Sequence, residues 1–249
     1  MIRGLYTAAT GMIHQRNKLD SIANNLANTN TRGYKKDDIV SRSFRDELLL
    51  RMSKGQSPKA LGPINHGVYA ERVTTFFQDG ALQQTGLITD VALQGEGFFT
   101  IIRDGQEFYT RDGTFKVNDQ GILVTMEGHV VAGEYGPIEV GQEDFEIDSE
   151  GYVWQGYNLI NRLQLVNFED PNALEKVGNN LFANNNPAEN PIIEFEGQVF
   201  QGYAEQSNVE LVDEISDMIT VSRSYEANLR ILQMLDNVLS KTVNEVGNV

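Results

Sequence analysis

The chain has 249 residues, no cysteine and a formal net charge of −15, from 20 Lys and Arg against 35 Asp and Glu. This length allows one or two packed domains. The lack of cysteine excludes disulfides and thiolate metal or redox centres, and the acidic balance disfavours non-specific binding to nucleic acid or to anionic membranes. We therefore expect proteins to be the main partners.

The first 25 residues contain no continuous apolar run of the kind found in a secretory signal, and no stretch of about 18 uncharged apolar residues occurs anywhere. We expect neither a cleaved signal peptide nor a membrane-spanning helix. Proteins without cysteine occur in the cytosol and outside it, so composition leaves the compartment open.

Residues 1–30 are predicted to form an amphipathic helix. Apolar side chains recur there at three- and four-residue spacing, which places them on one face of a helix. The stripe consists of Ile2, Leu5, Ala9, Met12, Leu19, Ala23 and Leu26, with Arg16 at the remaining position. We expect this face to contact a partner.

Residues 31–72 are predicted to be a linker that is partly extended. They mix basic and acidic side chains, have few periodic apolar positions and include the loose stretch SKGQSPK at 53–59. Residues 1–72 together carry 12 basic and 6 acidic side chains, whereas 73–205 carry 5 and 22. A strongly acidic centre therefore follows a basic N-terminal region.

Residues 73–205 are predicted to form a mainly β middle domain of antiparallel strands. Short alternating runs such as GFFTII, TFKVN and YVWQ are separated by turn dipeptides. The turns recur at Asp104-Gly105, Asp112-Gly113, Gln120-Gly121, Glu127-Gly128 and Glu150-Gly151. This spacing suits hairpins and leaves no room for crossover helices, so a parallel α/β fold is disfavoured.

Residues 206–249 are predicted to contain one long helix, whose apolar stripe over 211–246 is roughly 50 Å long at 1.5 Å per residue. Its stripe consists of Leu211, Ile215, Met218, Tyr225, Leu229, Leu232, Leu239, Val243 and Val246, with Ser222 and Asp236 in the same register. Further apolar residues, among them Ile219, Ile231 and Val238, widen this surface beyond one seam. Such a helix needs more than one neighbour.

The sequence offers no constellation for enzyme chemistry, and we expect no catalytic, cofactor-binding or metal-binding site. His14, His66 and His129 are isolated from one another and have no metal-site spacing. The pair Gly95 and Gly97 precedes a strand and not a helix, so it does not resemble a phosphate-binding loop. Acidic residues that alternate over 144–150 are interpreted as a solvated strand face and not as a glycosidase pair.

Four motifs resemble those of bacterial flagellar rod and hook proteins. The string IANNLANTNTRGYK at 22–35 resembles the family's N-terminal signature, here carried by Asn24, Asn25, Leu26, Ala27, Asn28, Gly33 and Tyr34. DVALQGEGFF at 90–99 and YTRDGTF at 109–115 are similar to its middle-domain motifs, and QGYAEQSNV at 201–209 is similar to its C-terminal signature. The four motifs occur in the family's order.

The resemblance implies a structural, non-enzymatic axial subunit of the flagellar basal-body rod. In that family the terminal helices pair as a coiled-coil tube domain, and the subunits polymerise helically to transmit torque and to form part of the export channel. Implied partners are copies of the chain, other rod and hook proteins, the type III export apparatus and the rod cap, with no nucleic acid, membrane insertion or cofactor. The implied location is outside the cytoplasmic membrane, reached without a cleaved signal.

Within the family, the length and the segment VVAGEYGPIEV at 130–140 favour the proximal rod group over the distal one. A hook or hook-junction component and an enzyme acting on peptidoglycan are the alternatives. Asn24, Asn25 and Asn28 are expected where the N-terminal helix ends, either as a plain helix end or as a joint with the β domain. On the second reading, Gly33→Val impairs rod assembly while the β domain stays folded.

Overall fold

The computed structural model describes residues 2–45, 47–51, 59–64 and 67–246. Contacts between Cα atoms divide the chain into two compact units. The helical unit contains Met1–Ala27, Asp37–Thr74 and Glu210–Val249, and the β unit contains Asn28–Lys36 and Thr75–Val209. The chain therefore passes from one unit to the other four times.

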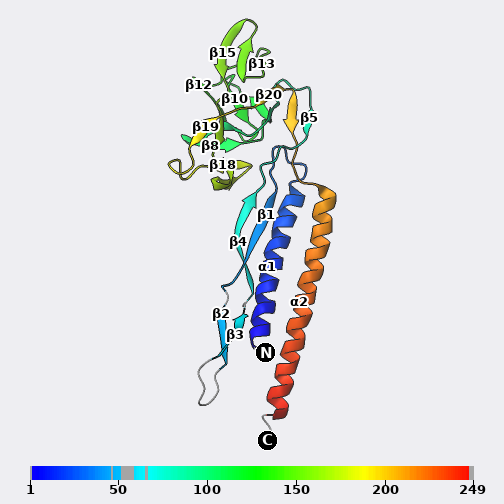
Figure 1. The fold of residues 1–249 in the computed structure, drawn as a ribbon. Helices are drawn as coiled ribbons and strands as arrows, with labels where there is room; N and C mark the ends of the chain where they lie inside the picture. Colours follow the sequence, from blue (N-terminus) through cyan, green and yellow to red (C-terminus); the bar gives the residue numbers. More distant parts are fainter. Residues whose placement is uncertain (1, 46, 52–58, 65–66, 247–249) are drawn as a thin grey trace. The chain divides into compact units, whose positions relative to one another are not determined.

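Two long helices dominate the helical unit (Figure 1). Helix α1 spans Ile2–Ala27 and helix α2 spans Leu211–Val246. Four strands belong with them: β1 (Asp37–Ser43), β2 (Glu47–Arg51), β3 (Lys59–Ile64) and β4 (Val68–Thr75). β1 pairs with β4, and β2 pairs antiparallel with β3.

The segment 31–72, for which the sequence predicts a partly extended linker, is thus largely paired into ribbons. The β1–β4 ribbon lies against α1, where the ring of Phe44 is 6.4 Å from that of Tyr6 and 5.1 Å from that of Tyr69. Too few apolar residues are present for a separate core, so the ribbon covers a helix. Most of the loose stretch at 53–59 lies outside the described residues.

The β unit is built from short strands, and its paired strands run antiparallel wherever their register is described. The first eight are β5 (Leu82–Gln84), β6 (Val91–Gln94), β7 (Phe98–Arg103), β8 (Gln106–Thr110), β9 (Phe115–Val117), β10 (Leu123–Thr125), β11 (Val130–Gly133) and β12 (Gly136–Pro137). The others are β13 (Glu146–Ile147), β14 (Tyr152–Gln155), β15 (Asn158–Arg162), β16 (Leu165–Phe168), β17 (Glu175–Gly178), β18 (Leu181–Ala183), β19 (Ile192–Glu194), β20 (Gln198–Gln201) and β21 (Tyr203–Glu205), with the 3-10 helix η1 at Pro171–Ala173.

One ten-stranded sheet organises the β unit. Its main path runs β17-β18-β8-β7-β11-β10-β9, with β12 beside β11, β16 beside β7 and β19 beside β16. A three-stranded sheet, β13-β14-β15, and the pairs β20-β6 and β21-β5 complete the unit. The antiparallel β domain predicted from the sequence is confirmed.

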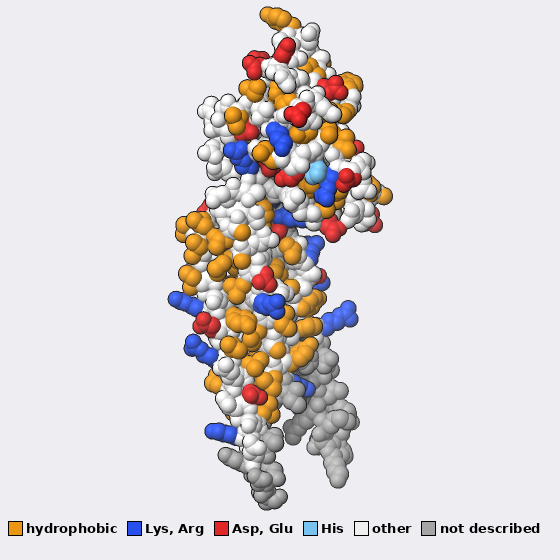
Figure 2. All heavy atoms as spheres, turned by 180° about the vertical axis from the view of Figure 1, so that it is seen from behind, with side chains coloured by type: hydrophobic (Ala, Val, Ile, Leu, Met, Phe, Trp, Pro, Cys, Tyr) orange, Lys and Arg blue, Asp and Glu red, His pale blue; other side chains and the backbone are white. Residues whose placement is uncertain are grey.

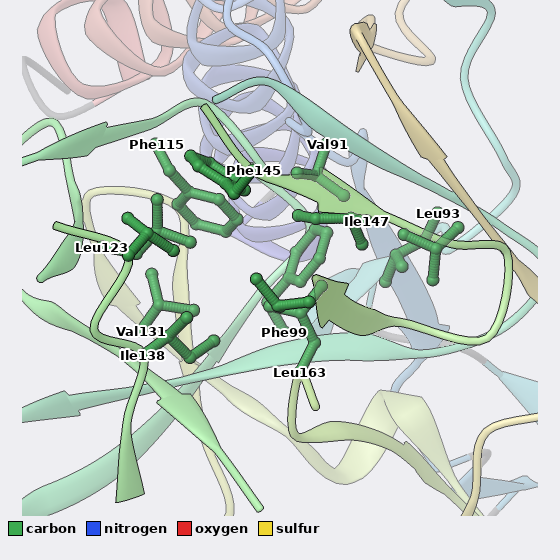
Figure 3. Packing of buried hydrophobic residues seen from close by; sticks show 13 residues of the cluster. Val91, Leu93, Phe99, Phe115, Leu123, Val131, Ile138, Phe145, Ile147 and Leu163 are labelled. Carbon is green, nitrogen blue, oxygen red and sulfur yellow. The ribbon is translucent and has the colours of Figure 1, made fainter. Parts of the chain in front are cut away.

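The core of the β unit has two clusters because β7 is buried on both faces. Successive side chains of a strand point to opposite faces. Phe99 therefore packs in the larger cluster, with Val91, Phe115 and others (Figure 3). Phe98 packs on the opposite face in an aromatic cluster with Phe182 and others. The prediction that the run GFFTII alternates is wrong, because both faces of β7 are buried.

Most of the predicted turns connect the strands as expected. Asp104 and Gly105 have φ of 53° and 79°, and Arg103 pairs with Gln106 across them, as in a two-residue hairpin turn. The dipeptides at 120–121, 127–128 and 150–151 also connect consecutive strands that pair with each other. The dipeptide at 112–113 lies between β8 and β9, which do not pair, so the prediction of a hairpin there is wrong. Local turn chemistry therefore predicts most hairpin positions.

Candidate functional site

Helices α1 and α2 pack against each other in antiparallel directions, and three contacts along their seam are seven and fourteen residues apart on each helix. A Cβ added at Gly4 of α1 would lie 3.2 Å from Leu235 of α2, and one added at Gly11 would lie 3.2 Å from Asn228. Asn25, near the other end of α1, hydrogen-bonds Glu214 at 3.3 Å. Small residues at the seam let the two backbones approach closely.

The predicted stripe of α1 lies beside this seam and not at its centre. Positions 4, 11 and 25, which contact α2, each precede a stripe residue by one. The stripe residues Leu5, Ala9, Met12, Leu19 and Leu26 are half-buried, and Ala23 is exposed. A hydrophobicity pattern could not identify the seam because glycine and asparagine do not count as apolar; the spacing of the small residues Gly4, Ala8 and Gly11 is the signal that could have found it.

The predicted stripe of α2 divides into two groups. Met218, Tyr225, Leu229, Leu232 and Leu239 are half-buried, whereas Leu211 and Ile215 are exposed. The side chain of Val243 lies outside the described residues. The role of all these residues in assembly remains a prediction.

Asn25 joins three segments of the helical unit. Its side chain is 1% exposed. Nδ2 donates hydrogen bonds to the Asp37 carbonyl at 2.8 Å and to Glu214, while Oδ1 accepts one from the Asp37 amide at 3.0 Å. Asn25 therefore fixes the last turn of α1, the start of β1 and the first turn of α2 together. Its neighbours Asn24 and Ala27 are exposed.

Asn28 begins the part of the signature that belongs to the β unit. Its carbonyl accepts a hydrogen bond from the Thr31 amide at 3.1 Å, and its side chain accepts one from the Thr31 hydroxyl at 3.1 Å. These bonds form a turn directly after α1. Tyr34 is buried beneath the Lys176 ammonium, which lies 4.7 Å from its ring centroid.

The backbone conformation and close neighbours of Gly33 disfavour any residue with a side chain at this position. Its φ is +65°, and a Cβ there would lie 2.5 Å from the backbone nitrogen of Asp112. Its amide donates a hydrogen bond to the Glu205 carbonyl at 2.9 Å. Because Gly33 lies inside the β unit, the expectation that a bulkier residue there leaves the β domain intact no longer follows.

A buried ionic cluster lies next to Gly33. Lys35 Nζ is 2.7 Å from Glu205 Oε1, and Arg111 Nε is 3.0 Å from Glu205 Oε2. Arg111 Nη2 is 2.6 Å from Asp79 Oδ1. Two cations thus face two carboxylates, and the side chains of Lys35, Arg111 and Glu205 are at most 2% exposed.

The remaining polar atoms of this ionic cluster also have partners. Arg111 Nη1 donates hydrogen bonds to the carbonyls of Gly95 and Gly97, and Glu205 Oε1 accepts one from the Gly80 amide. Burial lowers the pKa of Lys35, and the nearby Glu205 carboxylate partly opposes that shift. Such complete pairing is what allows charges to remain inside a protein.

The ionic cluster joins segments that are far apart in the sequence. Lys35, Arg111 and Glu205 come from the N-terminal, middle and C-terminal motifs. Asn208 makes a second connection between these segments. Its side-chain oxygen accepts a hydrogen bond from the Lys36 backbone amide at 2.7 Å, and its backbone amide donates one to the Tyr34 carbonyl at 3.4 Å. The segments by which the chain enters and leaves the β unit are thus held against each other, which the sequence did not predict.

The described residues offer no constellation for metal chemistry. Among them, no group of three or more His, Asp or Glu side chains is arranged to hold a metal ion. His14 contacts the Ser41 hydroxyl at 3.2 Å, and burial lowers its pKa; His66 lies outside the described residues. In the part of the chain that the structure describes, neither helix has the length and apolar content needed to span a membrane.

Three family models match the chain in the order of the motifs. A model described as "Flagella basal body rod protein" matches residues 5–35, and one described as "Flagellar hook protein FlgE/F/G D1 domain" matches 92–155. A third, "Flagellar basal body rod FlgEFG protein C-terminal", matches 201–245. The matched segments contain α1, much of the β unit and α2.

Curated relatives match over nearly the whole chain. The flagellar basal-body rod protein FlgG of Borreliella burgdorferi is 35% identical, over 96% of this chain and 97% of its own length. The flagellar basal-body rod protein FlgF of Caulobacter vibrioides is 34% identical over the full length of both chains. The flagellar hook-basal body complex protein FlhO of Bacillus subtilis is 29% identical, again over both full lengths.

These relatives share both the identity and the full-length coverage that establish a family. The paired terminal helices and the antiparallel β unit between them in sequence agree with the architecture that the motifs imply. The chain belongs to the flagellar basal-body rod protein family and is a structural, non-enzymatic subunit of that rod.

Proposed function

We propose that this subunit polymerises helically through the α1–α2 pair, with copies of itself and with other axial proteins of the rod and hook. In the polymer, the helix pairs form an inner tube that transmits torque and contributes to the protein-export channel. The single observation that carries this proposal is the large apolar surface of α2 that α1 leaves uncovered.

That surface is extensive for an isolated helix. Val212 is 77% exposed, Met234 58% and Ile219 49%, although each lies within α2. Hydrophobic side chains gather along the face of the helical unit that Figure 2 presents. A helix with apolar residues on every side is normally buried among several neighbours, and contiguous exposed apolar patches mark sites of protein association.

The acidic charge of the chain suits controlled assembly. Residues 73–205 carry 22 acidic against 5 basic side chains. This charge favours solubility of the monomer and makes two subunits repel each other at low ionic strength. Assembly is therefore nucleated on an existing rod and does not start spontaneously in solution.

The route to the rod follows from the family. We propose that the chain is exported unfolded through the flagellar type III apparatus without a cleaved signal, and that it is incorporated beneath a rod cap outside the cytoplasmic membrane. We also propose that the chain belongs to the proximal rod group, which its length and the segment at 130–140 favour. The identities of 35% to a relative named FlgG and 34% to one named FlgF are too similar to distinguish the two groups.

The decisive experiment is mass spectrometry of purified hook–basal bodies, with rods separated from detached hooks and filaments, together with motility of a deletion strain. We expect the protein in the rod fraction, and a non-motile deletion strain without hooks. Complementation with the full chain restores both rods and swimming. Rods and hooks that form normally in the deletion strain would contradict the proposal.

A further inference from the structure

We propose that α2 contacts two different neighbouring copies of this chain, through two apolar patches on different sides of the helix. This inference rests on the proposed function and adds to it which surface meets which neighbour. The first patch consists of Leu211, Val212, Ile215 and Ile219, and the second of Ala227, Ile231, Met234 and Val238. All eight side chains are exposed in the isolated chain.

The angular positions of the two patches differ widely. At about 100° per residue, the centres of the two patches lie about 115° apart around α2. The seam residues that face α1, such as Glu214, Asn228 and Leu235, lie on average about 150° from the first centre and about 100° from the second. The circumference of α2 is therefore divided into three faces, of which α1 covers one.

One partner helix cannot follow both patches. Their centres are about 27 Å apart along the axis at 1.5 Å per residue. A straight, parallel helix on the first patch would keep its angular position over this length. A left-handed coiled-coil partner would drift by about 20° per heptad in the direction away from the second patch, and so would move further from it.

The surface between the patches separates them further. Arg223 and Arg230 are exposed there, and by helical position both lie between the first patch and the second. Arg230 is 3.7 Å from the Glu226 carboxylate. An apolar partner surface that extended over both patches would have to bury this ion pair together with the Arg223 guanidinium, and taking such charged groups out of water is costly. The two patches therefore suit separate partners.

The occupants are inferred to be further copies because the patches continue the α1–α2 seam. Half-buried Met218 lies between the seam and the first patch. Half-buried Leu235, which belongs to the seam, lies on the side of the seam that is nearer the second patch. A helix from a neighbouring copy can thus extend the same packing on either side. Such a contact uses different surfaces on the two copies, which is the kind of contact that propagates as a helix.

The ribbon makes α1 a less suitable place for such contacts. Phe44 and Tyr69 of the β1–β4 ribbon pack near Tyr6 on α1, and a hydrogen bond joins Ser21 to the Asp37 carbonyl. Helix α1 thus has α2 at the seam and the ribbon elsewhere on its surface. Helix α2 provides the larger uncovered apolar area.

The test uses a photoreactive amino acid, p-benzoylphenylalanine, in place of Ile219, of Val238 or of both. The substituted chain is tagged and produced as a minority beside untagged wild-type chain, so that each tagged copy in the rod has untagged neighbours. After irradiation of purified rods, we expect tagged dimers from either single variant and tagged trimers from the double variant. The same variants irradiated as purified monomers give no crosslinked species.

Dimers alone from the double variant would show that one neighbour covers both patches, and would overturn the inference. A crosslink from either patch to a different axial protein in place of a second copy would overturn it as well. A second set of variants, Ile219→Cys and Val238→Cys, carries a smaller change in a chain that has no other thiol. In rods, maleimide labelling should be lost at both positions, and persistent labelling at either would contradict the inference.

Failure of the proposed function has a different signature. In that case the tagged wild-type chain itself, with no substitution, is absent from rods. If the tagged wild-type chain enters rods and only the crosslinking pattern differs, the polymerisation proposal stands and the two-neighbour inference fails.

Discussion

Lys35 Nζ lies 2.7 Å from Glu205 Oε1 in the interior of the β unit, although 170 residues separate the two in the sequence. Both side chains are 1% exposed. This ion pair, with Arg111 beside it, fixes the entry segment of the β unit to its exit segment. Removal of this ion pair therefore affects the β unit where its entry and exit segments meet.

Glu205→Gln is expected to destabilise the β unit strongly, because it leaves Lys35 and Arg111 buried with one carboxylate fewer. Breaking a buried ion pair from one side typically costs about 3–5 kcal/mol. The exposed pair Arg162–Glu134, at 2.9 Å, provides the matched control, and Glu134→Gln is expected to cost less than about 1 kcal/mol. Urea unfolding of the full chain measures both values, and equal losses would refute the structural role of the ionic cluster.

Gly33→Ala is expected to lower the free energy of unfolding by more than its backbone strain alone would. Gly156 has a φ of +61°, close to the +65° of Gly33, but a Cβ at Gly156 would have nothing within 4 Å. Gly156→Ala therefore costs only the left-handed strain of about 1–2 kcal/mol. Gly33→Ala adds a collision with the Asp112 backbone, worth about 1–3 kcal/mol more. Equal unfolding midpoints for the two variants would exclude this steric account.

Tyr109 is expected to make the stability of the β unit fall at high pH. Burial, supported by the charge and hydrogen bond of Glu107, raises the pKa of Tyr109 from its ordinary value of 10.0 to about 12. Above pH 10 the unfolded chain loses the phenolic proton while the folded chain keeps it. The stabilisation is therefore complete below pH 10 and is lost as the pH rises toward 12.

Tyr109→Phe removes this group, so its stability should decline less than that of the wild type between pH 9.5 and about 11.5. Urea midpoints measured across this range compare the two proteins. Parallel pH profiles would show that Tyr109 does not keep its proton in the folded state.

Removal of the helical segments is expected to leave a folded, monomeric β unit. A fragment over 28–209 retains the entry and exit segments with all four members of the ionic cluster, but lacks α1 and α2. Deletion of residues 1–30 or of residues 209–249 would also remove part of the β unit. We expect a monomer by size-exclusion chromatography, a cooperative thermal transition, and no incorporation into rods. A fragment that enters rods would show that the helices are dispensable for assembly.

Leu232→Asp, and likewise Leu229→Asp, is expected to weaken the α1–α2 pair, because a carboxylate would enter a half-buried apolar position. The expected loss is about 1–3 kcal/mol. Gln233→Asp places the same charge at the next, exposed position and is expected to change stability by less than about 0.5 kcal/mol. Circular dichroism at 222 nm and rod incorporation measure both effects. If Leu232→Asp and Gln233→Asp behave alike, Leu232 does not pack in the pair.

The sequence predicts those parts of the fold that depend on local patterns. The period of apolar residues identified both long helices, and Asp-Gly or Glu-Gly dipeptides identified the hairpins of the β unit. The seam between α1 and α2 could not be read in the same way. Its contacts at Gly4, Gly11 and Asn25 depend on close approach and on a side-chain amide, neither of which an apolar pattern reports.

The ionic cluster is a second feature that sequence patterns could not predict. Lys35, Arg111 and Glu205 each stand inside a motif that the sequence revealed, yet nothing local indicates that they meet. Such a pairing depends on the topology of the β unit, in which β7 and β8 lie centrally in the ten-stranded sheet. The entry and exit segments of the unit meet beside each other. For a related reason, the pairing of β1 with β4 was not predicted. Short strands that are mostly exposed show no clear pattern of apolar residues.

The position of Glu205 also affects the order in which the molecule can fold. The ionic cluster needs residues 35, 79, 111 and 205 at one place, so the β unit cannot complete its interior until four fifths of the chain is available. Contacts between such distant residues require the closure of long loops, and this slows folding. A chain that acquires its native interior so late remains unfolded for longer, which suits the unfolded export that we propose for this subunit.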